Sequence, residues 1–367
     1  MALRRTPLYD RHVAGGARVV DFAGWAMPQQ YTSVREEQRA VRQAAGLFDV
    51  SHMGRFEIEG PGAGDALQRL VTNDLSVLAP GRAQYTLLCN EGGGVIDDLV
   101  VYRAEEAAAG WSWRAVVNAA NRARDLAWLV EHAQPGITVV DRSEDLALLA
   151  LQGPLARQIL PAEGVDLDAI PYFGCAEARV AGAAVTLSRT GYTGEDGFEL
   201  FVPSRQAAAV WDALGAGGAV PCGLAARDVC RLEAGLRLYG QDMDEDTNPY
   251  EAGLGWTVKL DKGEFVGRDA LRILKTAGAA RSIVGIEGAG RAIPRRGASI
   301  WRGEEPVGTV TSGTYSFWLD KGIGMASIAA GAAPRGTRLG VDVRGGRGEV
   351  EIVPLPFYRG SVRQAVS

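Results

Sequence analysis

The chain has 367 residues, of which 47% are hydrophobic and 23% are charged, and its net charge at pH 7 is −5. This length exceeds one ordinary hydrophobic core, so we expect two or three domains. The acidic balance gives no general attraction to nucleic acid or acidic lipid, and no segment has the roughly 18 uninterrupted apolar residues of a membrane helix. Sparse cysteines without a CxxC pair and three scattered histidines argue against a disulfide scaffold and a structural zinc site. The N-terminal sequence has no apolar signal core, which favours a cytoplasmic protein.

The first part of the chain alternates helical and strand patterns. Residues 33–45 are typical of a capped helix, with Ser33 as N-cap and Glu36 three positions later. Two later segments have helical spacing, and three have strand patterns. The order along the chain is strand 54–60, helix 61–71, strand 83–89, strand 95–103 and helix 121–133. This order predicts an α+β unit with a mostly antiparallel sheet.

The second part of the chain begins with short strands and helices over residues 146–203. Two further helices are predicted at 204–214 and 225–235. The composition changes near residues 275–282, beyond which short strands are punctuated by Gly, Pro and Arg. We expect this tail of about 85 residues to form a small β-barrel or sandwich.

The stretch "NEGGGVIDDLVVYR", residues 90 to 103, places two carboxylates inside an apolar strand that follows a glycine turn. Asp97 and Asp98 are adjacent, so their side chains point to opposite faces of the strand. At least one therefore faces the interior or a cleft, where a carboxylate must be paired or its pKa rises. Such an acid is a catalytic candidate. The alternative is that Asp97 caps backbone amides of the hairpin while Asp98 ends in water.

The stretch "SRTGYTGEDGFEL", residues 188 to 200, combines two glycine-flanked turns with a strand. Tyr192 lies between glycines, where its ring can present a face to a flat ligand. Glu199 alternates with Phe198 and Leu200, which places it on the opposite face of the strand. The alternative is a loop whose acids face solvent.

Arg227 and Arg231 are four residues apart on a predicted helix, where surface ion pairing is the usual explanation. Arg227 is near the helix start, however, and the helix dipole disfavours a cation there. A role opposite an anion or another buried group is the alternative for Arg227.

Two other patterns fail as ligand motifs. In "GPGAGDALQRL", Asp65 occupies the third glycine position of a dinucleotide fingerprint, so a glycine turn before a helix is the better interpretation. The "DMDEDTN" stretch, residues 242 to 248, lacks the glycine and the final glutamate of a calcium loop. We expect a solvated acidic loop there.

Many long motifs occur in one order along the chain: "TPLYDRHV", "VDFAGWAMP", "LFDVSHMG", "TNDL", "GGVIDDLVVY", "LALQGP", "SRTGYTGEDGFEL", "GLAARDVCRLEAGLRLYGQDMDE", "FVGRDAL", "TSGTYS" and "PFYRGSVR". In these motifs the chain resembles the T-protein family, the aminomethyltransferases of the glycine cleavage system, over nearly its full length.

The resemblance implies an α+β protein whose three domains form a cloverleaf around a central folate pocket, with antiparallel-sheet domains and a C-terminal β-barrel. The implied domains are 1–50 with 141–232, 51–140 with 233–278, and 279–367. The implied reaction transfers the one-carbon unit of the aminomethyl group from the lipoyl arm of the H-protein to tetrahydrofolate and releases ammonia. Tetrahydrofolate is then the co-substrate and the H-protein the partner, and no metal is implied.

The resemblance also assigns roles to residues that match the family's motifs. Asp98 matches the essential aspartate, Glu199 the folate-contacting acid and Tyr192 the tyrosine that stacks on the pterin. Arg227 matches a functional arginine. Three further residues match pocket positions, namely Tyr85, Asn118 and Arg359.

One segment departs from the family's pattern. Residues 317–320 read Phe-Trp-Leu-Asp where family members commonly carry an "SPTL" turn, which concerns docking of the carrier. Two other functions remain open. One is a folate-dependent demethylase acting on a small N- or S-methyl compound. The other is a non-catalytic folate-binding accessory protein of iron–sulfur maintenance, whose cysteine motif is absent from "RLYGQDM", residues 237 to 243.

Overall fold

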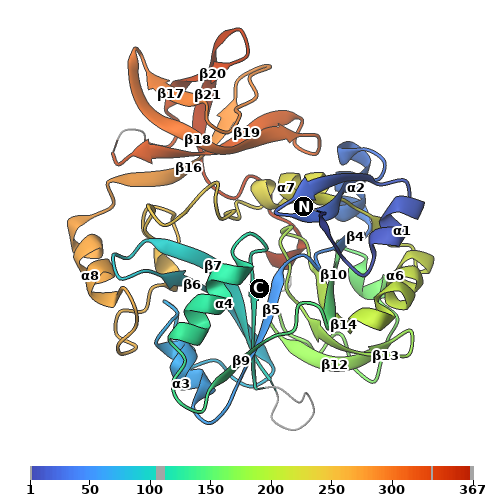
Figure 1. Ribbon diagram of the computed structural model, residues 1–367. Helices are drawn as coiled ribbons and strands as arrows, with labels where there is room; N and C mark the ends of the chain where they lie inside the picture. Colours follow the sequence, from blue (N-terminus) through green and yellow to red (C-terminus); the bar gives the residue numbers. More distant parts are fainter. Residues whose placement is uncertain (1, 105–111, 332–333, 364–367) are drawn as a thin grey trace.

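The computed structural model describes residues 2–104, 112–331 and 334–363. Its three largest sheets lie in three lobes, with the barrel above the other two in the view of Figure 1. The mixed helix and sheet content and the closed C-terminal barrel confirm the predicted α+β class with a barrel. Among the described residues, none of the helices has both the length and the apolar character needed to cross a membrane.

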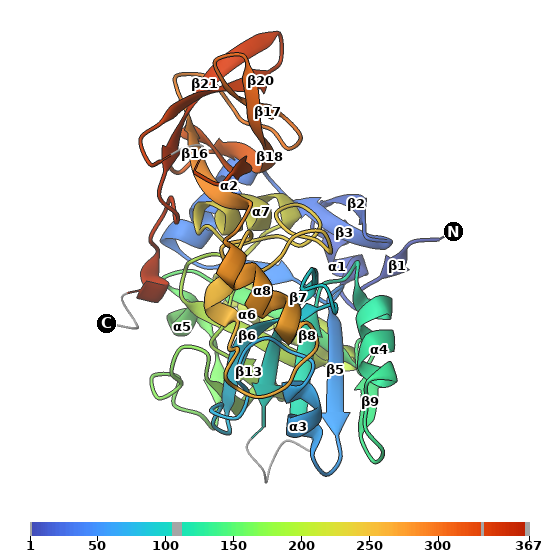
Figure 2. The same cartoon turned by 90° about the vertical axis from the view of Figure 1, so that its left-hand side faces the viewer.

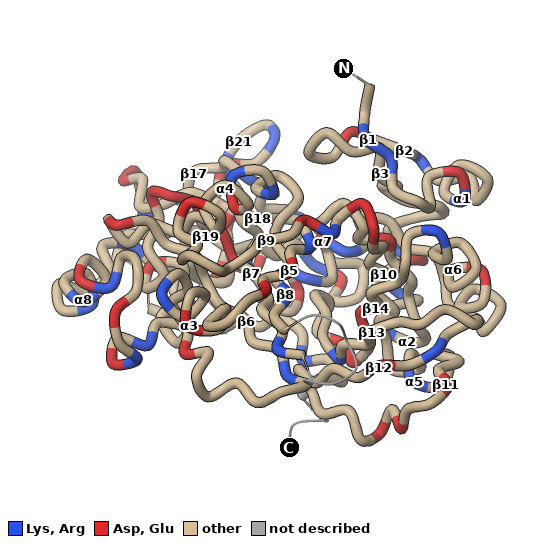
Figure 3. Tube along the Cα trace, turned by 60° about the horizontal axis from the view of Figure 1, so that its bottom comes forward, with Lys and Arg blue, Asp and Glu red and all other residues tan. Residues whose placement is uncertain are grey.

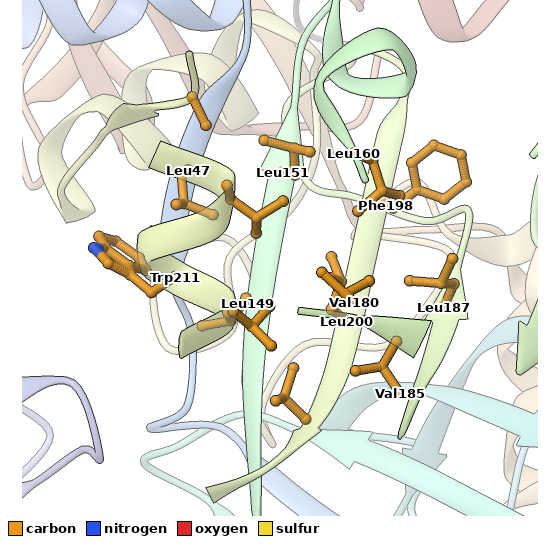
Figure 4. Packing of buried hydrophobic residues seen from close by; sticks show 14 of the residues in the cluster. Leu47, Leu149, Leu151, Leu160, Val180, Val185, Leu187, Phe198, Leu200 and Trp211 are labelled. Atoms are coloured by element: carbon orange, nitrogen blue, oxygen red, sulfur yellow. The ribbon is translucent and has the colours of Figure 1, made fainter. Parts of the chain in front are cut away.

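A seven-stranded sheet forms the first lobe. Its strands are antiparallel except for the last pair, which is parallel. In spatial order they are β11 (Ala162–Glu163), β12 (Cys175–Val180), β13 (Ala183–Ser188), β14 (Gly197–Pro203), β10 (Leu146–Gln152), β4 (Gly46–Asp49) and β15 (Val220–Pro221). Trp211 of helix α6 (Ala207–Ala216) belongs to the same core cluster as Leu149, Leu151 and Leu200 of the sheet (Figure 4). These apolar side chains form the largest core of the protein, because successive residues of each strand alternate between the two faces of the sheet.

A five-stranded antiparallel sheet forms the second lobe. In spatial order its strands are β6 (Arg82–Cys89), β7 (Val95–Arg103), β8 (Trp113–Val117), β5 (Gly54–Glu59) and β9 (Thr138–Asp141). The β6–β7 hairpin turns through three glycines. A Cβ atom at Gly94 would lie 1.8 Å from the carbonyl oxygen of Glu245, so only glycine fits this close approach. The same hairpin places Asp97 and Asp98 in the middle of the molecule.

The closed barrel forms the third lobe, at the opposite end from α3 (Figure 2). Its strands are β16 (Arg281–Gly288), β19 (Lys321–Ala329), β18 (Glu305–Ser316), β17 (Ser299–Arg302), β20 (Arg338–Val343) and β21 (Gly346–Val353). A small sheet near the N-terminus has the order β1 (Arg4–Arg5), β3 (Trp25–Gln30) and β2 (Arg18–Phe22).

The helices connect and cover these sheets. Helix α2 (Val34–Gln43) starts as predicted, because the Ser33 hydroxyl accepts a hydrogen bond from the Glu36 backbone N–H at 3.2 Å. Helix α7 (Leu224–Glu233) lies between the barrel and the lower lobes (Figures 1 and 2). The other helices are α1 (Tyr9–Ala14), α3 (Ala63–Gln68), α4 (Arg122–Glu131), α5 (Ala156–Ile159), α8 (Arg268–Ala277) and the short turns η1 (Ser204–Gln206), η2 (Gly255–Thr257) and η3 (Ser361–Arg363).

Different parts of the chain supply the strands of the three large sheets, which supports a division into three domains. The predicted domain boundaries stay a prediction. The strands of the seven-stranded sheet come from residues 46–49 and 146–221, and those of the five-stranded sheet from residues 54–141. Residues 105–111, 332–333 and 364–367, which belong to two of the predicted domains, lie outside the described residues.

Candidate active site

A cavity of about 1120 Å³ opens where the lobes meet. Strands β6, β7 and β14, helix α7 and the C-terminal segment all contribute to its wall. All seven residues predicted from the sequence line this cavity, namely Tyr85, Asp98, Asn118, Tyr192, Glu199, Arg227 and Arg359. The structure therefore brings together side chains that are up to 274 positions apart in the sequence.

Asp98 lies on β7 with its carboxyl group in the cavity wall. Oδ2 accepts a hydrogen bond from the Tyr85 hydroxyl at 3.0 Å, and Oδ1 accepts one from the Asn118 side-chain amide at 2.8 Å. Burial raises the pKa of Asp98 to about 7, and the adjacent charge of Asp97 adds to that increase. A carboxyl group with this pKa exchanges a proton readily near neutral pH.

Asp97 points to the other face of β7 and is fully buried. Its carboxylate accepts hydrogen bonds from the Asn118 backbone N–H at 3.0 Å, the Asn118 side chain at 2.8 Å and the Asn121 side chain at 2.7 Å. The alternative in which Asp97 caps the hairpin amides is wrong, because its donors come from the loop between β8 and α4. Asp98 lies in the wall of a cavity instead of ending at the outer surface.

Glu199 on β14 faces the cavity, while its neighbours Phe198 and Leu200 are in the core of the seven-stranded sheet. The alternation predicted from the sequence is confirmed. Glu199 is 9% exposed, and Oε2 accepts a hydrogen bond from the Thr190 hydroxyl at 2.5 Å. This single protein donor leaves most of the acceptor capacity of the carboxylate for groups in the cavity.

Arg227 and Tyr192 lie against each other in the cavity wall. The Arg227 guanidinium carbon is 4.8 Å from the centre of the Tyr192 ring, a cation–π contact. Arg227 Nη1 is buried without a hydrogen-bond partner among the described residues, and burial lowers the pKa of this side chain. The Tyr192 hydroxyl donates to the carbonyl oxygen of Arg237, which fixes the ring. An unpaired buried donor of this kind is suited to an acceptor that enters the cavity.

Among the described residues, Arg231, unlike Arg227, is paired with carboxylates. The surface ion pairing expected from the sequence does not describe Arg231, because this side chain is buried. Arg231 is 1% exposed and pairs with Asp228 at 2.8 Å and with Asp242 at 2.7 Å. The expectation of a solvated acidic loop is correct for Asp244 and Asp246 but wrong for Asp242. Asp242 also accepts hydrogen bonds from barrel residues, and this long-range pairing connects α7 to the barrel.

A buried ion-pair network holds the C-terminal segment beside the cavity. Arg42 contacts Glu195 at 2.9 Å and Glu233 at 2.5 Å. Glu195 in turn accepts hydrogen bonds from the Ser361 backbone at 3.0 Å and from its hydroxyl at 2.7 Å. Arg359, two residues before Ser361, is exposed at the rim of the cavity. The network therefore determines where Arg359 lies.

Other residues of the wall were not predicted from the sequence. His52 is 4% exposed, and its Nδ1 has no hydrogen-bond partner within the described part of the chain. Burial lowers its pKa to about 3, so its ring is neutral at pH 7. Trp256 is 59% exposed, and its ring stacks on Tyr85 with centroids 6.0 Å apart. An isolated His or Trp carries no spacing signal, and only the fold places these two at the cavity.

The segment that departs from the resemblance forms an aromatic rim on the barrel side. Phe317 lines the cavity, is 42% exposed and packs edge to face on Tyr315. Trp318 is 37% exposed and contacts Tyr358 edge to face. Phe317 and Trp318 therefore give the barrel side of the cavity an aromatic edge.

Acidic and basic residues are interspersed along the chain trace in all three lobes (Figure 3). Within the described residues, no group of three or more His, Cys, Asp or Glu side chains is placed to hold a metal ion.

Comparisons with known proteins agree with this arrangement. Residues 8–262 match the family description "GCVT N-terminal domain", and residues 281–359 match "Glycine cleavage T-protein C-terminal barrel domain". The chain is 48% identical to an aminomethyltransferase of Symbiobacterium thermophilum and 48% identical to one of Thermotoga neapolitana, with 99% of each chain covered in both comparisons. It is similar to the crystal structure of the glycine cleavage system aminomethyltransferase T of Bartonella henselae, with a TM-score of 0.91, 35% identity, and coverage of 98% of this chain and 99% of that one. The chain therefore belongs to the glycine cleavage T-protein family of aminomethyltransferases.

Proposed function

We propose that this chain is a tetrahydrofolate-dependent aminomethyltransferase, which takes its one-carbon unit from the aminomethyl-loaded lipoyl arm of an H-protein. The observation that carries the proposal is the convergence of seven residues on one cavity around Asp98, whose pKa is raised to about 7. Family membership supports the transferase class. The four cysteines are all free thiols, which fits a reducing compartment such as the cytoplasm.

The cavity wall fits a folate. Glu199 has acceptor capacity to spare and would bind the donor edge of a pterin ring, fixing its orientation. Tyr192 contributes an aromatic face to the wall, although Arg227 already covers one side of that ring. The unpartnered Arg227 Nη1 would bind a carbonyl or carboxylate oxygen of the ligand. Arg359 at the rim would meet negative charge at the outer end of the molecule.

In the proposed reaction, two bonds to the methylene carbon of the carrier break and two form. The carbon–sulfur and carbon–nitrogen bonds of the aminomethyl group are exchanged for bonds to N5 and N10 of the folate. The two protons released from these nitrogens go to the departing ammonia and to the carrier thiol, so the reaction involves no net oxidation. Asp98 would accept a proton from a folate nitrogen and stabilise the positive charge that develops there. Tyr85 and Asn118 hold its carboxyl group in place.

The carrier arm would enter past the aromatic rim. Trp256 and Phe317 are exposed at the cavity, where an aliphatic arm can cover them. Much of the rate acceleration then comes from holding the arm and the folate together in one site.

Product analysis tests this proposal. Wild-type protein is supplied with aminomethyl-loaded H-protein and tetrahydrofolate, and ammonia and 5,10-methylenetetrahydrofolate are both measured. We expect equal amounts of the two products, and no methylenetetrahydrofolate when either the loaded carrier or the folate is left out. Failure to form methylenetetrahydrofolate from fully loaded carrier, with folate bound to the protein, would refute the proposal.

A further inference from the structure

Asp125, in the first turn of helix α4, is a buried acid next to the candidate active site that the reaction described above does not use. It is 0% exposed. Neither of its carboxyl oxygens receives a hydrogen bond from a donor among the described residues. The Nε atom of Arg124 is 4.0 Å from Oδ1, but that arginine is 39% exposed and also pairs with Glu245. A buried carboxylate without donors would be costly, so this environment favours the protonated acid.

Asp125 lies beside Asp97. The Asn121 side chain donates to Asp97 at 2.7 Å, and the Asn121 carbonyl oxygen accepts from the Asp125 backbone N–H at 2.9 Å. The charge of Asp97 and a hydrogen bond to it are also among the causes that raise the pKa of Asp125. Two carboxyl groups in contact cannot both be ionised without a large electrostatic cost. Asp97 receives three amide hydrogen bonds, from Asn118 and Asn121, and these select it as the charged member of the pair. A single proton on this pair would therefore lie on Asp125, with its O–H donating to Asp97.

Asn118 connects this pair to Asp98. Its side-chain amide donates to Asp97 Oδ1 and to Asp98 Oδ1, at 2.8 Å in both cases. An amide has two N–H groups, so both are used by the two aspartates. The result is one continuous series of hydrogen bonds, from Asp125 through Asp97 and Asn118 to Asp98.

We propose that Asp125 is a positioning residue that, as a protonated acid, donates to Asp97, keeps the Asp97–Asp125 pair at one negative charge, and thereby sets the proton affinity of Asp98. The inference rests on the proposed function, in which Asp98 is the reacting carboxyl group. Burial, the charge of Asp97 and the hydrogen bond to Asp97 raise the pKa of Asp125 to about 10, in agreement with a neutral acid at pH 7.

Other ionisable groups also face these three carboxyl groups. They come from β6, from α4, from the loop between β13 and β14, and from the segment after α7. Tyr85 and Tyr192 interact with Asp98, Arg124 with Asp125, and Tyr239 with Asp97. One step further out, Glu245 pairs with Arg124, and Arg237 interacts with Tyr85 and Tyr192. None of them supplies a hydrogen-bond donor to Asp125.

Two variants separate a proton donor from a merely structural residue. In Asp125→Asn, a neutral amide replaces the neutral acid and still donates to Asp97. We expect the acidic limb of the pH profile of kcat/KM to keep its midpoint within about 0.3 pH units, and kcat/KM at pH 7 to stay within about twofold. Asp125→Leu keeps the branching and the number of side-chain heavy atoms but has no donor, so the charge of Asp97 acts more strongly on Asp98. We expect its midpoint to rise by about 0.5 to 1 pH unit and kcat at pH 7 to fall about two- to fivefold, with little change in KM.

Two kinetic outcomes would overturn the proposal. A fall of the midpoint by about 1 pH unit in Asp125→Asn would show that a negative charge had been removed, so that Asp125 is ionised in the wild type. Equal profiles for the Asn and Leu variants would show that the donated hydrogen bond has no effect on Asp98.

A direct readout does not depend on turnover. In protein labelled with ¹³C at aspartate carboxyl carbons, Asp98 is about half protonated at pH 7. We expect a second, protonated carboxyl resonance that titrates only above about pH 8 and is lost in either variant. A wild-type spectrum without such a resonance overturns the proposal even if neither variant folds. This resonance is measured without substrates, so failure of the proposed transferase reaction and failure of this inference are distinguishable.

Discussion

The raised pKa of Asp98 predicts a specific effect of Asp98→Asn on stability. The folded-state pKa is about 7, against 3.8 for an ordinary aspartate. Because the folded state binds this proton more tightly than the unfolded state does, folding is favoured at low pH and loses stability as the pH rises from about 4 to about 7. The gap between the two pKa values corresponds to about 4 kcal/mol above pH 7, at about 1.4 kcal/mol for each pH unit.

The amide in Asp98→Asn carries no charge and avoids this cost. It can still accept from Asn118, and its N–H group can donate to the Tyr85 oxygen, which reverses that hydrogen bond and leaves the Tyr85 O–H without its wild-type acceptor. Loss of the stronger bonds to a charged carboxylate offsets part of the gain, and we expect a net stabilisation of about 1–3 kcal/mol at pH 8.

Urea denaturation of both proteins at pH 5.5, 6.5, 7.5 and 8.5 measures this effect. The free-energy difference between variant and wild type should increase with pH up to about 7 and then level off. A variant that is less stable than wild type at pH 8, or a difference that does not change with pH, would refute the account of the Asp98 environment.

Three further substitutions test other parts of the site. Glu199→Ala should weaken tetrahydrofolate binding about 10- to 100-fold in calorimetry, while kcat at saturating substrate changes only a few-fold. The reason is that the lost hydrogen bonds bind the ring in both the ground state and the transition state. A normal affinity with a low kcat would assign Glu199 a chemical role. Arg227→Met should raise Tm by about 2–4 °C, because it removes a charged group whose buried Nη1 has no hydrogen-bond partner among the described residues, and should lower kcat/KM. A lower Tm would show that the cation–π contact with Tyr192 outweighs the cost of the unpartnered Nη1. Arg42→Met should cost about 3–5 kcal/mol of unfolding free energy because it leaves two buried carboxylates unpaired. Arg11→Met, at an exposed pair with Asp212, is its control and should cost less than about 1 kcal/mol.

Local patterns in the sequence predict much of the fold. Ser33 and Glu36 mark the start of α2, and the three glycines before Val95 mark the β6–β7 turn. Both signals act within a few residues, so they are visible without tertiary structure. The alternation around Glu199 also identifies correctly which face of β14 points away from the core.

The pairing of buried charges is not visible in the same way. Asp242 lies in an acidic stretch that is typical of solvated loops, yet it is buried against Arg231 and the barrel. This contact depends on how α7 packs on the third lobe, which no local pattern encodes. The burial of Asp125 has a weak signal in the sequence. Asp125 is four residues before the buried Leu129, so the two share one face of α4.

The central claim is that Asp98 is the reacting carboxyl group of a transferase that uses tetrahydrofolate. The most direct test is a single-turnover measurement of 5,10-methylenetetrahydrofolate formation from aminomethyl-loaded H-protein, for wild type and Asp98→Asn at saturating folate. We expect formation of product in the wild type and a decrease of about 10²- to 10⁴-fold in the variant, with folate affinity nearly unchanged. A variant that turns over at a near-normal rate would contradict the role of Asp98.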